Sequence, residues 1–247
     1  MRQLIKLSDL TDYSLAARDG EIGKLEEVYF DDNCWLVRYF IVSTGNWLLG
    51  RKVLIVPAVM GGIDEEAKTL SVDLTREQIE NCPPVNTKMS VSRHYEQEYY
   101  SYYGWEPYWN DDPMFGPAPY LSPPVEDTSD QPENPHLRSS DEVKNYSIHA
   151  CDGKIGHVED FILEVPDWTI RYLEVNTRSW LPGKHVLLAP AWIQQVDWAK
   201  QEVSIELTRE ALETAPAYDP SKIISRESQV RLYEHYGMKF EQDGGVD

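Results

Sequence analysis

The sequence predicts a mainly β protein built from two tandem small β-barrels, each followed by short helices and joined by a proline-rich acidic linker. Three observations predict this fold class. The chain repeats itself at a fixed offset, the apolar residues of each copy recur mostly with a period of two, and a segment rich in proline and acid separates the copies.

The repeat aligns residues 13–104 with residues 146–237 without a gap, and roughly a third of the aligned residues are identical. The matching strings keep their order: Asp19-Gly20-Glu21-Ile22-Gly23 with Asp152-Gly153-Lys154-Ile155-Gly156, Arg38-Tyr39 with Arg171-Tyr172, Trp47-Leu48-Leu49-Gly50 with Trp180-Leu181-Pro182-Gly183, and Leu74-Thr75-Arg76-Glu77 with Leu207-Thr208-Arg209-Glu210. Two copies are too few for a solenoid. Each copy must therefore bury its own core or share one with its twin.

Short strands are expected in both copies. In the first copy, Asp19-Gly20 predicts the tight turn of a hairpin between residues 13–17 and 24–31, because this pair tolerates a positive φ. Further strands are expected at 36–43, 53–57 and 70–74, and in the second copy at 170–176, 186–190 and 203–207. The recurring Gly23 and Gly156 predict a bulge or a close backbone approach. Strands this short are best stabilised in a small barrel that hides its edges.

Helices are expected after the last strand of each copy. Thr75 and Gln78 form a capping-box pattern, and Thr208 keeps the cap in the second copy. Helices of about three turns are expected over 92–104 and 225–237, each with a Ser start and a Gly stop. The first of these carries an aromatic stripe of Tyr95, Tyr99, Tyr102 and Tyr103. We favour packing of this stripe on the barrel over a stacking platform for a base or cofactor.

The expected domain organisation has four parts: a first module at 1–104, a linker at 105–140, a second module at 141–240 and a tail at 241–247. The linker holds half of the sixteen prolines and little periodic apolar sequence, which favours an extended, irregular chain. Its aromatic start, Trp105-Glu106-Pro107-Tyr108-Trp109, is expected to dock on a module.

Composition restricts the partners. The 23 Lys and Arg stand against 42 Asp and Glu, a net charge of -19 that repels a phosphate backbone, so no nucleic-acid partner is expected. No apolar run approaches a membrane span, and the N-terminus has no secretory signal pattern, so we expect no direct membrane insertion and a cytoplasmic location. The three cysteines show no zinc spacing and are expected to be reduced.

The ordered strings resemble the PRC-barrel family. They are Asp19-Gly20-x-Ile22-Gly23, Arg38-Tyr39-Phe40-Ile41-Val42, Val53-Leu54-Ile55-Val56-Pro57 and Val72-Asp73-Leu74-Thr75. This family includes the cytoplasmic domain of the photosynthetic reaction centre H subunit and, more distantly, the C-terminal domain of the ribosome maturation factor RimM. The two copies look like bacterial tandem two-barrel members. The resemblance implies PRC-type barrels that act as docking surfaces, and it carries over no catalytic motif.

No catalytic, cofactor-binding or metal-binding residue is assigned, because no common framework for such chemistry is present. His149, Cys151 and His157 form a local group of soft ligands, which we interpret as surface residues of a hairpin. The acid pairs Glu26-Glu27 and Glu159-Asp160 point to opposite faces of a strand, so in each pair we expect one acid in water and the other paired with a cation such as Arg38 or Arg171. We interpret both arginines as structural.

The loops of residues 44–51 and 177–184 are the candidate interface, because each presents Trp, Leu, Gly and a cation between two strands. The candidate residues are Trp47, Leu48, Arg51, Trp180, Leu181 and Lys184. The competing interpretation is that each Trp caps the open end of its own barrel.

The sequence thus favours a non-enzymatic protein-interaction or assembly module, whose partner is another protein or a second copy of the chain. A first alternative is an accessory subunit of a membrane electron-transport or reaction-centre-like complex. A second alternative is an enzyme whose site the sequence does not reveal.

Overall fold

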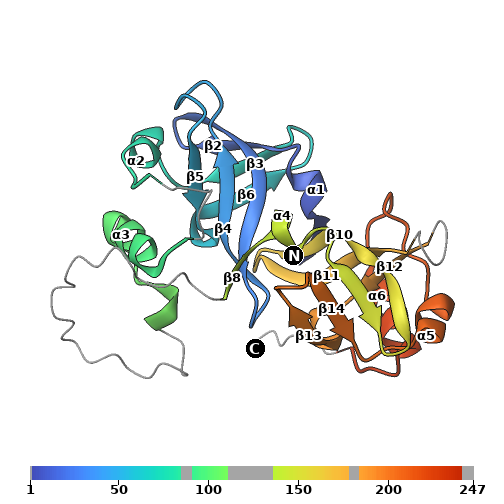
Figure 1. Cartoon of the computed structure of the whole chain (residues 1–247). Helices are drawn as coiled ribbons and strands as arrows, with labels where there is room; N and C mark the ends of the chain where they lie inside the picture. Colours follow the sequence, from blue (N-terminus) through green and yellow to red (C-terminus); the bar gives the residue numbers. More distant parts are fainter. Residues whose placement is uncertain (1, 85–90, 111–135, 178–183, 241–247) are drawn as a thin grey trace. The chain divides into compact units, whose positions relative to one another are not determined.

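The computed structural model describes residues 2–84, 91–110, 136–177 and 184–240. It divides them into two units, each of which holds one copy of the repeat. The N-barrel consists of Tyr13–Asp32 and Arg38–Leu137, and the C-barrel consists of Met1–Asp12, Asn33–Val37 and Arg138–Asp247. Strands dominate both units, which confirms the mainly β fold class (Figure 1).

The N-barrel is a curled sheet with strand order β5-β4-β3-β2-β7-β6, in which β2 and β7 run parallel. Its strands are β2 (Ser14–Ala17), β3 (Gly20–Asp31), β4 (Leu36–Ser43, shared with the C-barrel through its first two residues), β5 (Lys52–Ile55), β6 (Met60–Asp64) and β7 (Thr69–Val72). A 3-10 turn, η1 (Pro57–Val59), precedes β6. Strand β6 was not predicted, and its glycine pair Gly61-Gly62 gives it little intrinsic preference for strand. Its equivalent β13 (Ile193–Asp197) was not predicted either.

The first hairpin forms as predicted. Ala17 pairs with Gly20 across the turn, and Gly20 has a φ of 151°. The pairing shifts register beside Gly23, where a β-carbon would lie 1.9 Å from the carbonyl oxygen of Ser43. Gly156 occupies the same position in the second copy, where a β-carbon would lie 2.0 Å from the carbonyl oxygen of Asn176. The predicted bulge and close approach are both confirmed.

The N-barrel helices begin where the capping residues predict. Helix α2 (Arg76–Glu80) has the complete Thr75–Gln78 capping box. Helix α3 (Arg93–Tyr103) starts at the Ser92 cap and stops at Gly104, which is left-handed with a φ of 68°. Asp19, in the hairpin turn, accepts a 2.8 Å hydrogen bond from the Arg76 amide and so fastens the start of α2.

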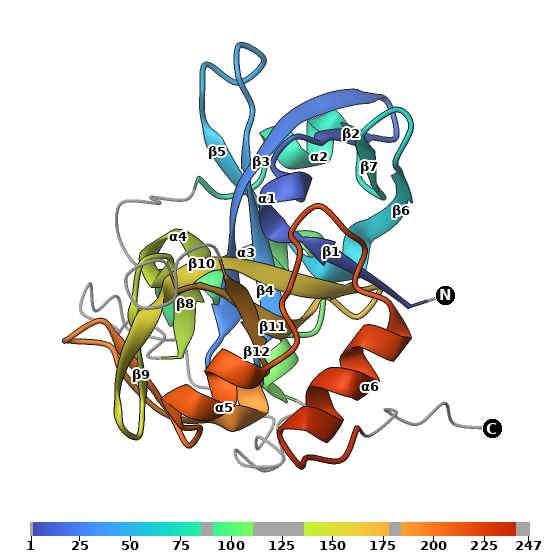
Figure 2. The same cartoon turned by 90° about the vertical axis from the view of Figure 1, so that its right-hand side faces the viewer.

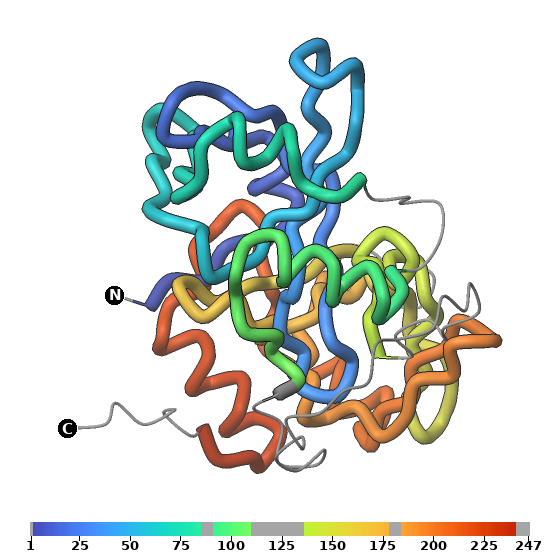
Figure 3. Tube along the Cα trace, turned by 90° about the vertical axis from the view of Figure 1, so that its left-hand side faces the viewer, coloured from blue at the N-terminus to red at the C-terminus, as the bar shows by residue number. Residues whose placement is uncertain are grey.

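Helix α3 lies on the barrel through its aromatic side chains, and its green trace continues into residues 105–110 (Figure 3). Tyr99 is fully buried, and Trp105, Tyr108 and Trp109 pack against the same core cluster as Tyr99. The short turn η2 (Tyr108–Asn110) ends this docked segment. The expected packing of the tyrosine stripe is confirmed for Tyr95, Tyr99 and Tyr103, whereas Tyr102 is 41% exposed and lies outside the cluster. The expected docking of the aromatic start of the linker is confirmed.

The C-barrel repeats the strand order as β12-β11-β10-β9-β14-β13, again with one parallel pair, β9 with β14. Its repeat elements are β9 (Ser147–Ala150), β10 (Gly153–Val165), β11 (Thr169–Asn176), β12 (His185–Leu188), η3 (Pro190–Trp192), β13 (Ile193–Asp197), β14 (Glu202–Ile205), α5 (Arg209–Thr214) and α6 (Arg226–His235). Both helices keep the predicted caps, Thr208 and Ser225. The two copies of the repeat therefore fold alike.

The N-terminal segment belongs to the C-barrel, although we expected residues 1–104 to form one module. Strand β1 (Gln3–Lys6) pairs antiparallel with β10, from Gln3 with Val165 to Lys6 with Ile162 (Figure 2). The short helix α1 (Leu7–Leu10) follows and buries Leu7 and Leu10. The C-barrel also includes Asn33–Val37, which lie where the chain passes from β3 to β4. Leu36 in this segment pairs with Thr169, which is its own equivalent in the repeat.

The end of the expected linker is ordered, which corrects its boundary at residue 140. Strand β8 (Leu137–Ser139) pairs with β3, and helix α4 (Ser140–Val143) follows it from the Ser139 cap. The offset of the repeat makes β8 the equivalent of β1, so each leading strand pairs with the long strand of the other copy. Residues 111–135 and the tail after residue 240 lie outside the described chain.

Candidate functional site

The loop of residues 44–51 joins β4 to β5 and is closed by its own hydrogen bonds. The amide and the hydroxyl of Thr44 donate to the carbonyl of Arg51, at 3.2 and 2.6 Å. Inside this closure Trp47 N donates to Thr44 O at 3.2 Å and Gly50 N to Gly45 O at 2.6 Å. The N-barrel therefore presents a loop whose shape is set before any partner arrives.

Arg51 points back into the N-barrel. Its guanidinium donates to the carbonyls of Glu80 and Cys82, at 3.0 and 2.5 Å, at the end of α2. Carbonyls at a helix end lack intrahelical partners and carry partial negative charge, so a cation stabilises them. Arg51 thus has an internal contact as well as its predicted place in the interface loop.

Lys184 makes the same contact in the C-barrel. Its ammonium donates to the carbonyls of Leu212, Glu213 and Ala215 at 3.0, 2.5 and 2.8 Å. Burial lowers the pKa of Lys184, and the charge of Glu213 opposes this shift. Trp180 and Leu181 lie outside the described residues, so only Lys184 represents the second loop.

We predict that Arg51→Ala and Lys184→Ala each lower the free energy of unfolding by about 1–2 kcal/mol, because the carbonyls at the helix end lose a charged donor. Urea unfolding measures the change. Lys24→Ala, at an exposed strand position, is the control and should have little effect. An unchanged midpoint with altered sedimentation would instead assign the two cations to an interface.

Trp47 is half-buried, and the Arg76 guanidinium lies 4.4 Å from the centre of its ring. One face of the indole is thus covered by its own barrel, in line with the capping interpretation. Leu48 is also half-buried. The predicted apolar members of the first loop are therefore only partly available to a partner.

Leu49 is the most exposed part of the loop, with 98% of its surface accessible. Its φ is 53°, in the left-handed region, which costs a residue other than glycine about 1–2 kcal/mol. Leu49 was not among the predicted interface residues. The repeat nevertheless contained a signal, because a residue that the barrel itself needs should recur in both copies. Leu48 recurs as Leu181, whereas Leu49 is replaced by Pro182.

The mid-strand arginines are structural, as predicted. Arg38 lies 3.3 Å from Asp31, and Arg171 lies 2.6 Å from Glu164 at the equivalent position. One acid of each predicted acid pair does meet a cation, but the cation is a lysine and not Arg38 or Arg171. Glu26 pairs with Lys52, and Asp160 lies within ion-pair distance of Lys6 and Lys144. The strand alternation was predicted correctly for Glu159 and Asp160, since Glu159 is exposed and Asp160 is buried.

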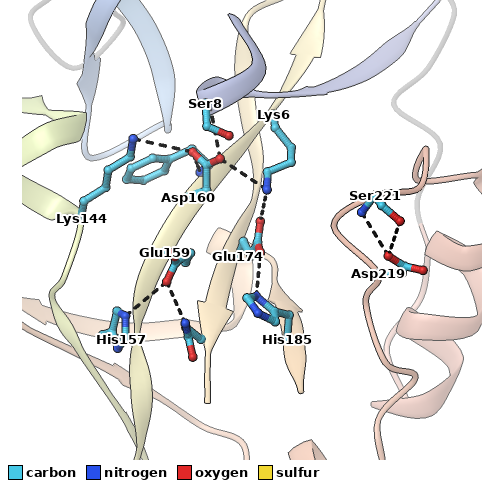
Figure 4. A network of polar contacts seen from close by, with 12 residues as sticks. Lys6, Ser8, Lys144, His157, Glu159, Asp160, Glu174, His185, Asp219 and Ser221 are labelled. Carbon is cyan, nitrogen blue, oxygen red and sulfur yellow. Dashed lines mark hydrogen bonds and ion pairs between the residues drawn. The ribbon is translucent and has the colours of Figure 1, made fainter. Parts of the chain in front are cut away.

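Asp160 and Glu174 form a buried acidic pair in the C-barrel, with 2% and 1% of their surfaces exposed. Lys6 of β1 lies 3.7 Å from Asp160 Oδ2 and 2.9 Å from Glu174 Oε2 (Figure 4). The Ser8 amide donates to Asp160 at 3.3 Å, and His185 Nδ1 lies 2.7 Å from Glu174 Oε1. These contacts fasten β1 and α1 to the barrel, and the acids face cations rather than an open cavity.

Burial works against the charge of Lys6, but the hydrogen bond to Glu174 and the negative charges of Glu174 and Asp160 outweigh it and raise the pKa of Lys6 above its ordinary value. The ammonium is therefore charged at neutral pH. In the N-barrel, Ile41 stands at the position of Glu174. The ionic network is consequently a property of one copy and not of the repeated scaffold.

The soft ligands of the second hairpin do not converge. His149 lies 3.7 Å from Glu202 and His157 lies 3.3 Å from Glu159, while Cys151 is exposed. Among the described residues, no group of three or more His, Cys, Asp or Glu side chains is placed to hold a metal ion.

The comparisons agree with the fold. Residues 3–79 match the PRC-barrel domain family. This segment is a PRC-barrel domain. The equivalent segment of the second copy, residues 136–212, has its helices and strands in the same order. No curated protein matches the chain. Within the described residues, no helix has the length and apolar character required to cross a membrane.

Proposed function

We propose that this PRC-barrel protein is a non-enzymatic assembly module that binds another protein through the tip of the 44–51 loop. PRC-barrel membership supports an interaction or assembly role in general terms. The observation that carries the specific proposal is Leu49, an apolar side chain that is almost wholly exposed, in a strained conformation, on a loop closed by hydrogen bonds.

The contact expected at Leu49 is the insertion of one aliphatic side chain into an apolar pocket of the partner. The loop pays little conformational entropy on binding, since its hydrogen bonds already fix its shape. The half-buried Trp47 and Leu48 precede the anchor in the same loop and keep part of their apolar surface accessible. The partner is a different protein or a second copy of this chain, and either kind of partner would bind Leu49.

We predict that Leu49→Asn separates binding from stability. Asn tolerates the left-handed region better than Leu, so the free energy of unfolding should stay the same or rise by up to about 1 kcal/mol. The bound partner should be lost, or the self-association should disappear in sedimentation velocity. Urea unfolding of the same preparation supplies the stability.

Met238→Asn, which changes another exposed apolar residue in the C-barrel, is the matched control and should keep the partner. If Leu49→Asn retains every stoichiometric partner and the assembly state of the wild type, the proposal that this loop binds protein is wrong.

A further inference from the structure

The two copies of the repeat differ in how they fill the space beneath their last helix. In the N-barrel, two tyrosine rings of α3 fill it, with centroids 6.1 Å apart. Tyr99 donates its hydroxyl to the Leu54 carbonyl at 2.8 Å, and Tyr95 donates to the Pro83 carbonyl at 3.0 Å. Each phenol therefore has both an apolar contact and a hydrogen-bond acceptor.

The C-barrel has lost both rings. Ser228 and Leu232 stand at the positions of Tyr95 and Tyr99 on the equivalent helix α6. Neither Ser nor Leu reaches as far as Tyr, and neither carries an aromatic ring.

The scaffold around the lost rings is kept. Tyr172 donates to Gln229 at 3.1 Å, as Tyr39 donates to Glu96 at 2.9 Å in the N-barrel. Contacts between the two helices are also repeated. His235 Nε2 lies 2.8 Å from the Ala211 carbonyl oxygen. At the equivalent positions of the N-barrel, the Tyr102 hydroxyl donates to the Gln78 carbonyl at 2.9 Å. The helix of the C-barrel is thus held by contacts equivalent to those of α3.

A groove lies where the rings would be. It has a volume of about 200 Å³, and its lining includes Leu187, Pro216, Ser228, Gln229 and Leu232. Leu187 and Pro216 are the equivalents of Leu54 and Pro83, whose carbonyls accept the tyrosine hydroxyls in the N-barrel. The C-barrel therefore keeps the walls and the acceptor positions of a phenol site while lacking the phenols.

We propose that this groove binds a small aromatic molecule that carries a phenol-type hydroxyl. The ring lies against Leu187 and Leu232. The hydroxyl donates to the carbonyl of Leu187 or of Pro216, which are the equivalents of Leu54 and Pro83. Apolar walls with a few convergent polar groups are typical of small-molecule sites. A neutral ligand suits the rim, where Lys222 and Asp219 already neutralise each other at 2.8 Å.

A free small molecule fits better than an extended peptide. Tyr218 lines the groove, and its amide donates to the His185 carbonyl at 3.1 Å, forming a bridge with the start of β12. This part of the strand edge is therefore already occupied. A peptide that adds a strand would need that edge for its main-chain hydrogen bonds.

The test uses the full chain and p-cresol, which is the side chain of tyrosine as a free molecule. Titration followed by NMR should shift the methyl signals of Leu187 and Leu232 in a saturable way. Toluene, which lacks the hydroxyl, should bind at least about tenfold more weakly because one buried acceptor stays unpaired. Equal binding of toluene would overturn the phenol assignment, and tighter binding of a blocked Ala-Tyr-Ala peptide would overturn the assignment to a small molecule.

The deciding variant restores the tyrosines of the other copy. Ser228→Tyr with Leu232→Tyr should fill the groove and weaken p-cresol binding at least about tenfold, while Glu234→Tyr adds a tyrosine at an exposed position of α6 and should leave binding unchanged. If the double variant does not fold, Ser228→Tyr alone, at an exposed position, should still weaken binding. Unaltered p-cresol binding in the folded filled variant would show that the groove is not the site.

Discussion

Gly23→Val should destabilise the N-barrel by about 3 kcal/mol or more, because the new side chain has no room to form. A β-carbon at Gly23 would lie 1.9 Å from the Ser43 carbonyl oxygen and 3.0 Å from the α-carbon of Thr44. These atoms belong to the backbone at the end of β4, which cannot move aside as a flexible side chain would. Relief requires that β3 and β4 separate at the point where the 44–51 loop begins.

Urea unfolding of Gly23→Val measures this loss, and Gly62→Val is the matched control. Gly62 is exposed in β6, and a β-carbon there would meet nothing within 4 Å. The control should be neutral or slightly stabilising, since valine favours strand and reduces the freedom of the unfolded chain. An unfolding midpoint of Gly23→Val equal to that of Gly62→Val would show that the close approach is not required.

Lys6→Ala should cost about 3 kcal/mol, because it leaves Asp160 and Glu174 buried with less positive charge to balance them. The loss should be accompanied by release of β1 and α1, measured as faster amide hydrogen exchange over residues 3–10. Lys52→Ala breaks the more exposed pair with Glu26 and should cost less than about 1 kcal/mol. Similar losses for the two variants would contradict the role of Lys6.

The pH dependence of the Lys6 contribution has a definite sign. Because the pKa of Lys6 is raised in the folded protein, its stabilising contribution is complete below the pKa of the unfolded chain and is lost only as the pH rises through the higher folded value. The stability difference between wild type and Lys6→Ala should therefore stay constant from about pH 7 to 9 and shrink in stronger alkali. A difference that falls away near neutral pH would contradict this assignment.

The candidate interface could be predicted only in part. The repeat identified the Trp loops, since a Trp-Leu pair followed two residues later by Gly recurs in the sequence. It did not distinguish Arg51 and Lys184, which hold helix ends, from Leu49, which faces solvent. That distinction depends on the backbone conformation at the loop tip and on which carbonyls lie within reach of each cation.

The local structure of this protein follows directly from its residue types. Capping by Ser92 and Ser225, the Asp19-Gly20 turn and the bulge at Gly23 act over a few residues or through one close contact, so the residue types alone predict them. The long strand with which β1 pairs could not be predicted in this way, because two similar repeats offer two similar strand edges. The choice matches the charges: Lys6 meets Glu174 on the C-barrel, whereas the N-barrel has Ile41 at that position. Such a pairing gains its energy only when residues distant in sequence are buried together.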